Sequence, residues 1–315
     1  KPDVLIIAGD IFDRVSPPQS ALTRFGDFIK RVTLDNDLAV VAIAGNHDSA
    51  GQLEAPKQVL QVLKTHVVGS LEDDPKDRVL YLPDNDNPKV AIAMIPFLRD
   101  RDLRVAKGGE GEDEIRSQVV AGIQRIYKET AEATANIKCP VVATGHLTVL
   151  GASTSDSERD IHIGGLGAIT PDTFPRQFSY VALGHLHRPQ ATDGDDRVRY
   201  AGSPIPLSFS ETQDVKEVRI LDCIKDQITH HSLPIPVYRR LSQIRTTTTA
   251  LENALEKFDP DFGELRTWVE VVIEDATLDG DLNESVRKLV EGRDFDVLKV
   301  LRGIPAPVIG MSVGE

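Results

Sequence analysis

Four apolar segments of this chain each end at a glycine, and a residue that can bind a metal ion follows at once. In α/β sheets, ligands gather where parallel strands end at their carboxyl edge. Each glycine lets the backbone turn tightly and come close to a bound group. One such ending carries little information, but four with the same pattern predict a single divalent-metal site. The residues that follow segments 4–9, 40–45, 141–145 and 180–184 are Asp10, Asn46-His47-Asp48, His146 and His185-Leu186-His187.

The side chains at these positions select the class of metal. Carboxylate, amide oxygen and imidazole suit Mn²⁺, Fe²⁺ or Zn²⁺, and the lack of cysteine excludes a thiolate site. His185 and His187 face the same way, because residues two apart share one face of an extended segment. The candidates outnumber the ligands of one tetrahedral ion, so we expect two ions about 3.5–4 Å apart with Asp10 as the bridge. The expected ligands are Asp10, Asn46, His146, His185 and His187.

A metal pair of this kind predicts a reaction. Two ions bind the attacking and leaving oxygens of a phosphoryl group, and they lower the pKa of a bound water so that hydroxide is available near neutral pH. The predicted chemistry is therefore hydrolysis of a phosphoester by direct in-line attack.

His47 is expected to act outside the metal shell, because adjacent side chains diverge and its neighbour Asn46 is an expected ligand. Above the phosphate, its imidazole can donate a hydrogen bond or a proton to the leaving oxygen. Asp13 either holds this imidazole in the right tautomer or has only a structural role, and the pattern does not decide between the two. Asp48 is a second candidate for the same task, but a cap on the following helix is the favoured interpretation.

The elements that position these residues follow an α/β pattern from residue 3 to about 235. One helix is expected to begin at Ser16, which precedes two prolines and can serve as its N-cap. Further helices are expected over 54–65 and 114–136. The stretch 151–167 is rich in Gly, Ser and Asp, and we expect a long loop there.

The composition changes after Pro234-Ile235-Pro236. We therefore expect two domains, residues 1–235 with the metal motifs and residues 236–315 as a small α/β domain with Trp268 in its core. Its elements are expected in the order β-α-β-α-β, at 238–246, 249–258, 267–274, a helix capped by Asp281 or Asn283 and running to 291, and 295–301.

Composition narrows the functional class. The chain has 315 residues with 40% hydrophobic and 27% charged, as is usual for a soluble globular protein, and no apolar run approaches the roughly 20 residues of a membrane span. Cys139 and Cys223 lie in or beside apolar runs, so buried reduced thiols and a cytoplasmic location are expected. The net charge of −13 excludes a protein that holds nucleic acid over its whole surface. Any nucleic acid must meet local basic patches or the metals.

The motifs resemble those of a known family. Gly9-Asp10-x-x-Asp13-Arg14, Gly45-Asn46-His47-Asp48, Gly145-His146 and Gly184-His185-x-His187 are similar to the calcineurin-type metallophosphoesterases. The strings at 95–99, 144–148, 155–161 and 200–209 resemble the SbcD-type nuclease subunits of bacterial SbcCD complexes. This resemblance implies a metallophosphoesterase sandwich, with two mixed sheets flanked by helices, and a small C-terminal α/β capping domain.

The resemblance also implies roles for the residues. Asp10 would bridge two Mn²⁺ ions, Asn46, His146 and His185 would complete one ion, His187 would bind the other, and His47 would act on the phosphate. The implied substrate is DNA, cut as a 3′-to-5′ exonuclease on duplex ends and as an endonuclease on single strands or hairpins, in DNA replication, repair and recombination. The implied partner is an SbcC-type coiled-coil ATPase, which makes cleavage ATP-dependent, in a heterotetramer that contains an SbcD-type homodimer near the nucleoid.

Two other functions remain open at this point. The same core motifs would serve a phosphatase or phosphodiesterase that acts on nucleotides or phosphoproteins. A non-catalytic scaffold that binds DNA ends is the third possibility. For the homodimer, the stripe Leu22, Phe25 and Ile29 is a candidate contact, although a role facing the core is favoured.

One feature departs from the family pattern. Its members open with a strand that ends in Asp-x-His, which supplies two more ligands to the ion that His187 binds, and no such element precedes Asp3. Asp160-Ile161-His162 has the same letters but lies in the mid-chain loop. We therefore expect an N-terminal truncation, and weak or absent activity in this polypeptide.

Restoring the upstream segment is expected to restore Mn²⁺-dependent cleavage, because it would complete the ligands of the second ion. The measurement is cleavage of end-labelled duplex DNA with and without Mn²⁺. A complete gene product that contains no upstream Asp-x-His would contradict the expectation.

Overall fold

The computed structural model describes residues 1–155, 158, 161, 169–260, 264–275 and 282–303. The chain divides into two units. The first contains residues 1–204 and 215–234, and the second contains residues 205–214 and 235–315. Assignment of a nuclease domain and a capping domain to the ranges 1–235 and 236–315 stays a prediction. No helix in the described part of the chain is long and apolar enough to cross a bilayer.

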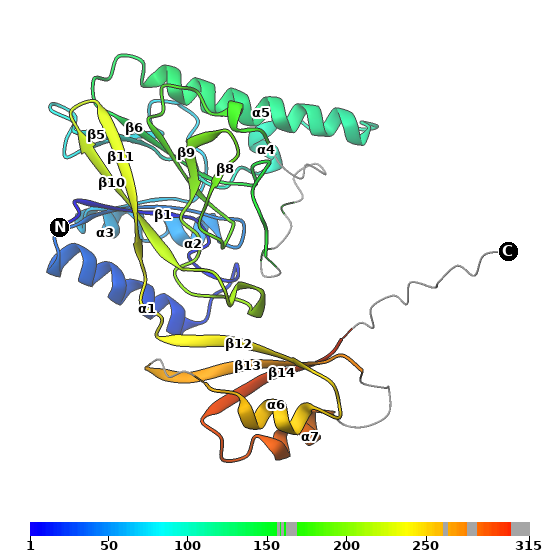
Figure 1. Ribbon diagram of the computed structural model, residues 1–315. Coiled ribbons are helices and arrows are strands. Elements are labelled where there is room, and N and C mark those ends of the chain that lie inside the picture. The colour runs from blue at the N-terminus through cyan, green and yellow to red at the C-terminus, as the bar shows by residue number, and fades with distance from the viewer. Residues whose placement is uncertain (156–157, 159–160, 162–168, 261–263, 276–281, 304–315) are drawn as a thin grey trace. The chain divides into compact units, whose positions relative to one another are not determined.

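The first unit is built on two sheets (Figure 1). One is parallel, with strand order β1-β2-β3, and the other is mixed, with order β4-β5-β6-β7-β9-β8. Several of these strands are short, buried runs of Val, Ile and Ala, as expected for strands covered on both faces. The bounds are β1 Val4–Ala8, β2 Ala39–Ile43, β3 Thr65–Val68, β4 Val79–Leu82, β5 Val90–Ala93, β6 Val141–His146, β7 Tyr180–Gly184, β8 Gln190–Thr192 and β9 Asp195–Tyr200.

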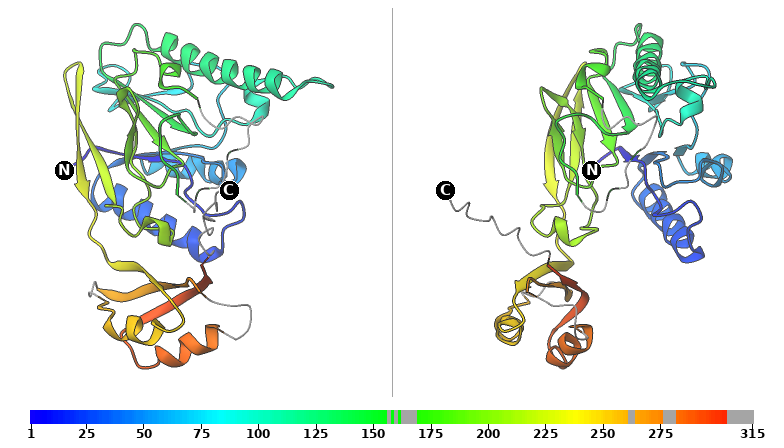
Figure 2. Two further views of the ribbon diagram at one scale, coloured as in Figure 1. Left: turned by 45° about the vertical axis from the view of Figure 1, so that its right-hand side comes forward. Right: turned by 90° about the vertical axis from the view of Figure 1, so that its right-hand side faces the viewer.

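Helices flank both sheets (Figure 2). Helix α5 packs its buried Ile123 and Ile126 in one cluster with residues of β5 and β6, and α1 packs beside residues of β2 and β3. A further cluster joins Val41 and Ile43 of the first sheet to Ile92 of the second. The predicted α/β sandwich of sheets flanked by helices is thereby confirmed. The helices are α1 Gln19–Lys30, continued by the π-turn η1 Arg31–Asp35, α2 Ala50–Glu54, α3 Lys57–Val62, α4 Asp100–Leu103, α5 Glu112–Ala133 and the 3₁₀ turn η2 Pro171–Thr173.

Two helix boundaries differ from the prediction. Helix α1 begins at Gln19 with Pro18 in the N-cap position, so Ser16 lies too early to cap it. The helix expected over 54–65 is shorter, because α2 ends at Glu54 and α3 begins only at Lys57, after Pro56. A proline interrupts a helix because it lacks the N–H that the preceding turn requires.

The apolar stripe of α1 faces the core of its own unit. Ile29 is buried, and Leu22 and Phe25 pack against the cluster that contains Phe12. The Phe12 and Phe25 rings meet edge to face with centroids 5.6 Å apart. The favoured core role therefore fits these three residues better than a dimer contact.

An antiparallel hairpin of β10 (Glu217–Ile224) and β11 (Gln227–Pro234) completes the first unit. It contacts the six-stranded sheet through His230, whose ring centroid lies 5.5 Å from that of Tyr180 and whose Nε2 lies 3.0 Å from Asp196 Oδ2. Cys223 on this hairpin is exposed and Cys139 is half-buried, so the expectation of two buried thiols was wrong.

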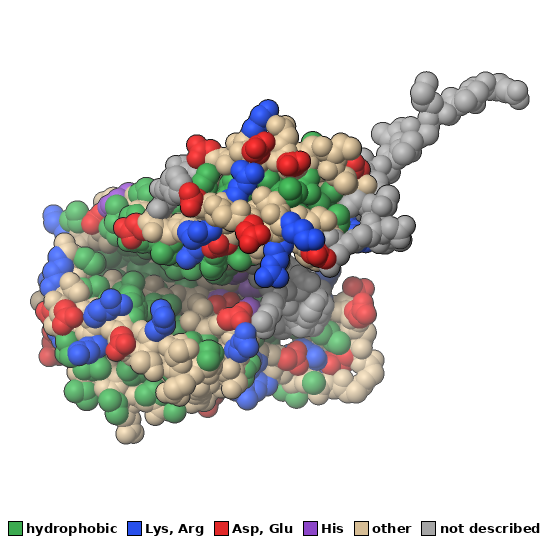
Figure 3. All heavy atoms as spheres, turned by 90° about the horizontal axis from the view of Figure 1, so that it is seen from below, with side chains coloured by type: hydrophobic (Ala, Val, Ile, Leu, Met, Phe, Trp, Pro, Cys, Tyr) green, Lys and Arg blue, Asp and Glu red, His purple; other side chains and the backbone are tan. Residues whose placement is uncertain are grey.

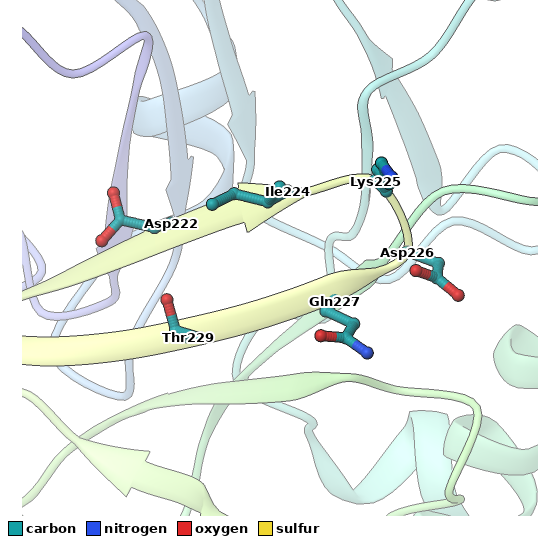
Figure 4. A pocket seen from close by; sticks show the side chains of 6 residues that line it. All are labelled: Asp222, Ile224, Lys225, Asp226, Gln227 and Thr229. Carbon is teal, nitrogen blue, oxygen red and sulfur yellow. The ribbon is translucent and has the colours of Figure 1, made fainter.

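A shallow hollow lies at the turn of this hairpin (Figure 4). Its two carboxylates, Asp222 and Asp226, are directed away from each other rather than toward a common point. The hollow therefore has no convergent set of ligands. Its lining residues are Asp222, Ile224, Lys225, Asp226, Gln227 and Thr229.

The second unit has a parallel sheet of order β12-β13-β14 with two helices, in the β-α-β-α-β sequence that the pattern predicted. Val269 and Val271 of β13 are buried in its core. Trp268 lies on the opposite face, is 36% exposed and carries Arg239 4.2 Å above its ring, so its assignment to the core was wrong. The elements are β12 Arg239–Thr246, α6 Leu251–Lys257, β13 Leu265–Ile273, α7 Leu282–Leu289, β14 Phe295–Arg302 and the 3₁₀ turn η3 Phe209–Glu211.

Two buried tyrosines hold the chain on either side of the end of β6. Tyr200 donates its hydroxyl proton to the Leu147 carbonyl at 2.9 Å and accepts from the Val149 N–H at 3.0 Å. Tyr127 donates to the Thr144 carbonyl at 3.1 Å. Burial raises the pKa of both phenols, so both stay protonated and able to donate.

Tyr200→Phe is expected to lower the free energy of unfolding by about 1–3 kcal/mol, because the buried Val149 N–H loses its partner. Tyr127→Phe serves as the matched variant and is expected to cost only about 0.5–1.5 kcal/mol, because it removes a single donated bond. Urea unfolding measures both. If Tyr127→Phe lowers the free energy of unfolding by as much as Tyr200→Phe or more, the acceptor role given to the Tyr200 hydroxyl is incorrect.

Candidate metal centre

The carboxyl ends of β1, β2, β6 and β7 meet where the two sheets face each other. The Nε2 atom of His146 lies 3.1 Å from Asp10 Oδ2 and 2.9 Å from Asn46 Oδ1. Candidate ligand atoms of Asp10, His146 and His185 all lie within 4.8 Å of one another. The structure thus brings together four of the five residues that the sequence suggested as metal ligands, two from each sheet.

Bare backbone at two glycines permits this approach. A Cβ atom at Gly45 would lie 2.1 Å from Asp10 Oδ1, and one at Gly184 would lie 1.7 Å from the Ala8 carbonyl oxygen. Real Cβ atoms do not come this close to other atoms. A side chain at Gly45 would therefore displace Asp10, and one at Gly184 would push the two sheets apart at the site.

Two of the candidate ligands have an unusual backbone conformation. Asp10 has φ of 50° and His185 has φ of 96°, both in the left-handed region that non-glycine residues rarely adopt. Such residues cost about 1–3 kcal/mol each and cluster at functional sites. The turns after β1 and β7 therefore direct these side chains at a cost to stability.

A single hydrogen bond sets the tautomer of His146. Its Nδ1 lies 2.8 Å from the Ala8 carbonyl oxygen, which can only accept, so Nδ1 carries the ring proton. Nε2 then presents a lone pair toward Asp10 Oδ2 and Asn46 Oδ1. Three lone pairs meet with no proton between them, and a cation stabilises such an arrangement. A backbone carbonyl on the second nitrogen is also the usual support of a metal-binding histidine.

The electrostatics of the site favour the metal-binding forms. Burial raises the pKa of the Asp10 carboxyl, but the hydrogen bond and charge that the His146 ring offers when it is protonated, together with the N–H of His47, lower it by more, so the pKa lies below its ordinary value. Burial, and then the nearby His146 ring, lower the pKa of His185 to about 3. An ionised carboxylate and a neutral imidazole are the forms in which these groups bind metal.

His47 lies beside this cluster. Its backbone N–H donates to Asp10 Oδ1 at 2.9 Å, and its ring Nδ1 lies 3.0 Å from the Asp13 carbonyl oxygen. The Asp13 carboxylate is 4.0 Å from that nitrogen and is exposed, and it also contacts Arg14 at 3.3 Å. The main chain of Asp13, rather than its side chain, therefore supplies the closer partner of the imidazole. A role for the Asp13 carboxylate in catalysis stays a prediction.

Asp48 has a role that the sequence did not indicate. Its buried carboxylate accepts hydrogen bonds from the N–H groups of Gly45, Ile11 and Phe12 at 2.8–3.1 Å. The expected helix cap was wrong, because Ser49 caps α2. Asp48 instead ties the turn after β1 to the turn after β2, and burial raises its pKa by more than its three donors lower it.

His187 lies outside the cluster formed by Asp10, His146 and His185 among the described residues. Its N–H donates to Glu158 Oε1 at 2.7 Å, and that oxygen lies 3.9 Å from its ring Nδ1. No feature of the sequence marked Glu158 as a functional residue, although it lies in the string 155–161 that carried the resemblance. Asp160 and His162 of the same loop lie outside the described residues.

Comparisons with known proteins agree with this geometry. A family model described as calcineurin-like phosphoesterase matches residues 1–189, which include all four strand ends. The chain is 34% identical over 306 residues to the SbcD subunit of nuclease SbcCD from Escherichia coli (strain K12), a match that covers 95% of this chain and 75% of that protein. It is 38% identical over 245 residues to the SbcD subunit from Rhodobacter capsulatus, covering 74% of this chain and 60% of that protein. The match to the SbcD subunit from Bacillus subtilis (strain 168) is 30% over 224 residues, or 70% of this chain and 56% of that protein.

Asp48→Ala is expected to lower the free energy of unfolding by about 3 kcal/mol or more, because three N–H groups lose a charged acceptor. It is also expected to weaken Mn²⁺ binding, because the turns that hold Asp10 and Asn46 are no longer joined. Urea unfolding of the chelator-treated protein and calorimetric Mn²⁺ titration measure the two effects.

Ser49→Ala is the neighbouring control for Asp48→Ala. It removes a helix cap at a cost of about 1 kcal/mol and is expected to leave Mn²⁺ affinity unchanged. The role given to Asp48 does not hold if the two variants behave alike.

Proposed function

Because this chain belongs to the calcineurin-like phosphoesterase family and, within it, to the SbcD-type nuclease subunits, we propose that it cuts DNA with a pair of divalent metal ions. The proposed activities are 3′-to-5′ exonuclease on duplex ends and endonuclease on single strands and hairpins. The observation that carries the proposal is the convergence of Asp10, Asn46 and His146 lone pairs at the meeting point of the two sheets.

Mn²⁺ is the proposed metal. Asp10 would bridge the two ions, with Asn46, His146 and His185 holding one and His187 the other. Bound ions of this kind lower the pKa of a water and stabilise charge on phosphoryl oxygens. The fixed Nδ1–H of His146 and the neutral ring of His185 support these assignments, since both leave a lone pair free for a cation.

His47 is proposed to act on the phosphate. Its Nδ1 is held by the Asp13 carbonyl, which leaves Nε2 as the atom that meets substrate. In the protonated ring, Nε2–H donates to a phosphoryl oxygen or to the leaving oxygen. The hydrogen bond from its backbone N–H to Asp10 keeps His47 next to the expected bridging carboxylate.

DNA is proposed to bind through the metals and local basic side chains. The chain has a net charge of −13, and Lys and Arg side chains are interspersed with Asp and Glu on the face drawn in Figure 3. A protein of this charge gains little from non-specific attraction to phosphates. The substrate must therefore be captured mainly at the centre itself.

The proposed partner is an SbcC-type coiled-coil ATPase that makes cleavage dependent on ATP. The relatives are each named as one subunit of an SbcCD nuclease, which supports a role for this chain in a larger complex. We propose an SbcD-type homodimer within a heterotetramer, acting at the nucleoid in the cytoplasm.

His47→Ala is expected to lower DNA cleavage by about 10²–10⁴-fold while Mn²⁺ affinity is retained, because the imidazole acts on phosphate and not on metal. His146→Ala is expected to lose both cleavage and Mn²⁺ binding. The assay uses end-labelled duplex and hairpin DNA with Mn²⁺, with and without the partner ATPase and ATP, and it is run on the complete gene product.

A generic aryl phosphate in the same assay separates the competing functions. Its hydrolysis without DNA cleavage would replace the nuclease with a phosphatase or small-molecule phosphodiesterase. Binding of DNA without cleavage of either substrate would support a scaffold.

A further inference from the structure

Two buried charged side chains form hydrogen bonds with the main chain of His187, one with its N–H group and one with its carbonyl. Its N–H donates to Glu158 Oε1 at 2.7 Å, and its carbonyl accepts from Lys216 Nζ at 2.8 Å. The side chain of Glu158 is 4% exposed, and Lys216 is 6% exposed. A carboxylate therefore meets the N–H and an ammonium meets the carbonyl of one residue, and such charge-assisted hydrogen bonds are about twice as strong as neutral ones.

A third group reaches the same carbonyl. The backbone N–H of Ser203 donates to the His187 oxygen at 3.0 Å, and the Ser203 hydroxyl accepts from Lys216 Nζ at 3.1 Å. Gly202 permits this approach, because a Cβ there would lie 2.7 Å from the His187 oxygen and its φ is 79°. Three segments far apart in the chain thus converge on the main chain of one residue.

This arrangement is costly for a purely structural contact. Charges taken out of water lower stability unless hydrogen bonds compensate them, and apolar packing holds most loops without that cost. The residue held in this way lies two positions after His185, where the backbone has φ of 96°. The charged groups therefore hold the backbone of the turn after β7, which carries His185 and His187.

We propose that Glu158, Lys216 and Ser203, here named the His187 clamp, are positioning residues that fix His187 as a ligand of the second metal ion. The inference rests on the proposed function, which assigns His187 to that ion. Metal ligands must be held within about 0.5 Å of the productive geometry, and loss of a group that orients a ligand commonly weakens metal binding about 10–100-fold. The clamp supplies this orientation through the main chain.

The test compares Mn²⁺ binding in variants of the complete gene product, by calorimetric titration and by the electron paramagnetic resonance spectrum of bound Mn²⁺. His187→Ala first defines the binding that depends on His187. Glu158→Ala and Lys216→Met are each expected to weaken that binding about 10–100-fold and to shift the spectrum toward that of His187→Ala. Glu158→Gln is expected to recover part of the affinity, because its amide oxygen can still accept from the His187 N–H.

Glu110→Ala is the matched control. Glu110 is also a buried carboxylate that accepts from a backbone N–H, that of Lys107 at 2.9 Å, and it pairs with Arg104 at 2.8 Å. Its replacement is expected to lower the unfolding temperature while Mn²⁺ binding stays unchanged. If Glu110→Ala loses as much Mn²⁺ affinity as Glu158→Ala does, the loss reflects a general destabilisation of the fold, and the proposed clamp is wrong.

The remaining outcomes distinguish failure of the clamp from failure of the metal assignment. If His187→Ala weakens Mn²⁺ binding but folded Glu158→Ala and Lys216→Met bind as the wild type does, the clamp is wrong and the metal assignment stands. If His187→Ala binds Mn²⁺ as the wild type does, His187 is no ligand, and the two-ion assignment and the clamp fail together.

Discussion

The hydrogen bond from His146 Nδ1 to the Ala8 carbonyl joins the two sheets at the point where the chemistry is proposed to occur. It links the end of β6 to the end of β1, and it decides which nitrogen of the ring stays free. Without it the ring could carry its proton on Nε2, and that proton would bond Asp10 in place of a cation. The bare backbone of Gly184 beside the same carbonyl keeps this contact short.

Acidic groups on the three-stranded sheet side give the centre its charge. Asp10 and Asp48 lie close enough for the charge of Asp10 to contribute to the raised pKa of Asp48. The Asp48 carboxylate accepts hydrogen bonds from three backbone N–H groups. Asp10 accepts only one, from His47 to Oδ1, and its Oδ2 lies 3.1 Å from His146 Nε2. One carboxylate therefore holds the fold and the other remains available to a metal, although both follow strand ends of the same sheet.

The sequence predicted the parts that depend on local pattern. The pattern of an apolar strand that ends in glycine and a polar residue identified Asp10, Asn46, His146 and His185. The β-α-β-α-β order of the small C-terminal unit followed from segments with strand periodicity that alternate with segments of helix periodicity. The misses depended on contacts between distant segments. Nothing near Asp48 in the chain indicates that its partners include Ile11 and Phe12, and nothing near Glu158 points to His187. The β10–β11 hairpin escaped notice because its polar and apolar residues give no single buried face, and the exposure of Trp268 depends on which face of β13 the two helices cover.

The path of the chain between its two units has a further consequence. The polypeptide passes from one to the other after residues 204, 214 and 234, because residues 205–214 belong with the second unit while 215–234 return to the first. A gene rearrangement that replaced only residues 235–315 would leave residues 205–214 behind, without the rest of the unit to which they belong. The two units are therefore connected by three chain crossings rather than one. We expect them to have been inherited together in evolution, because the smaller unit cannot be exchanged as one continuous segment.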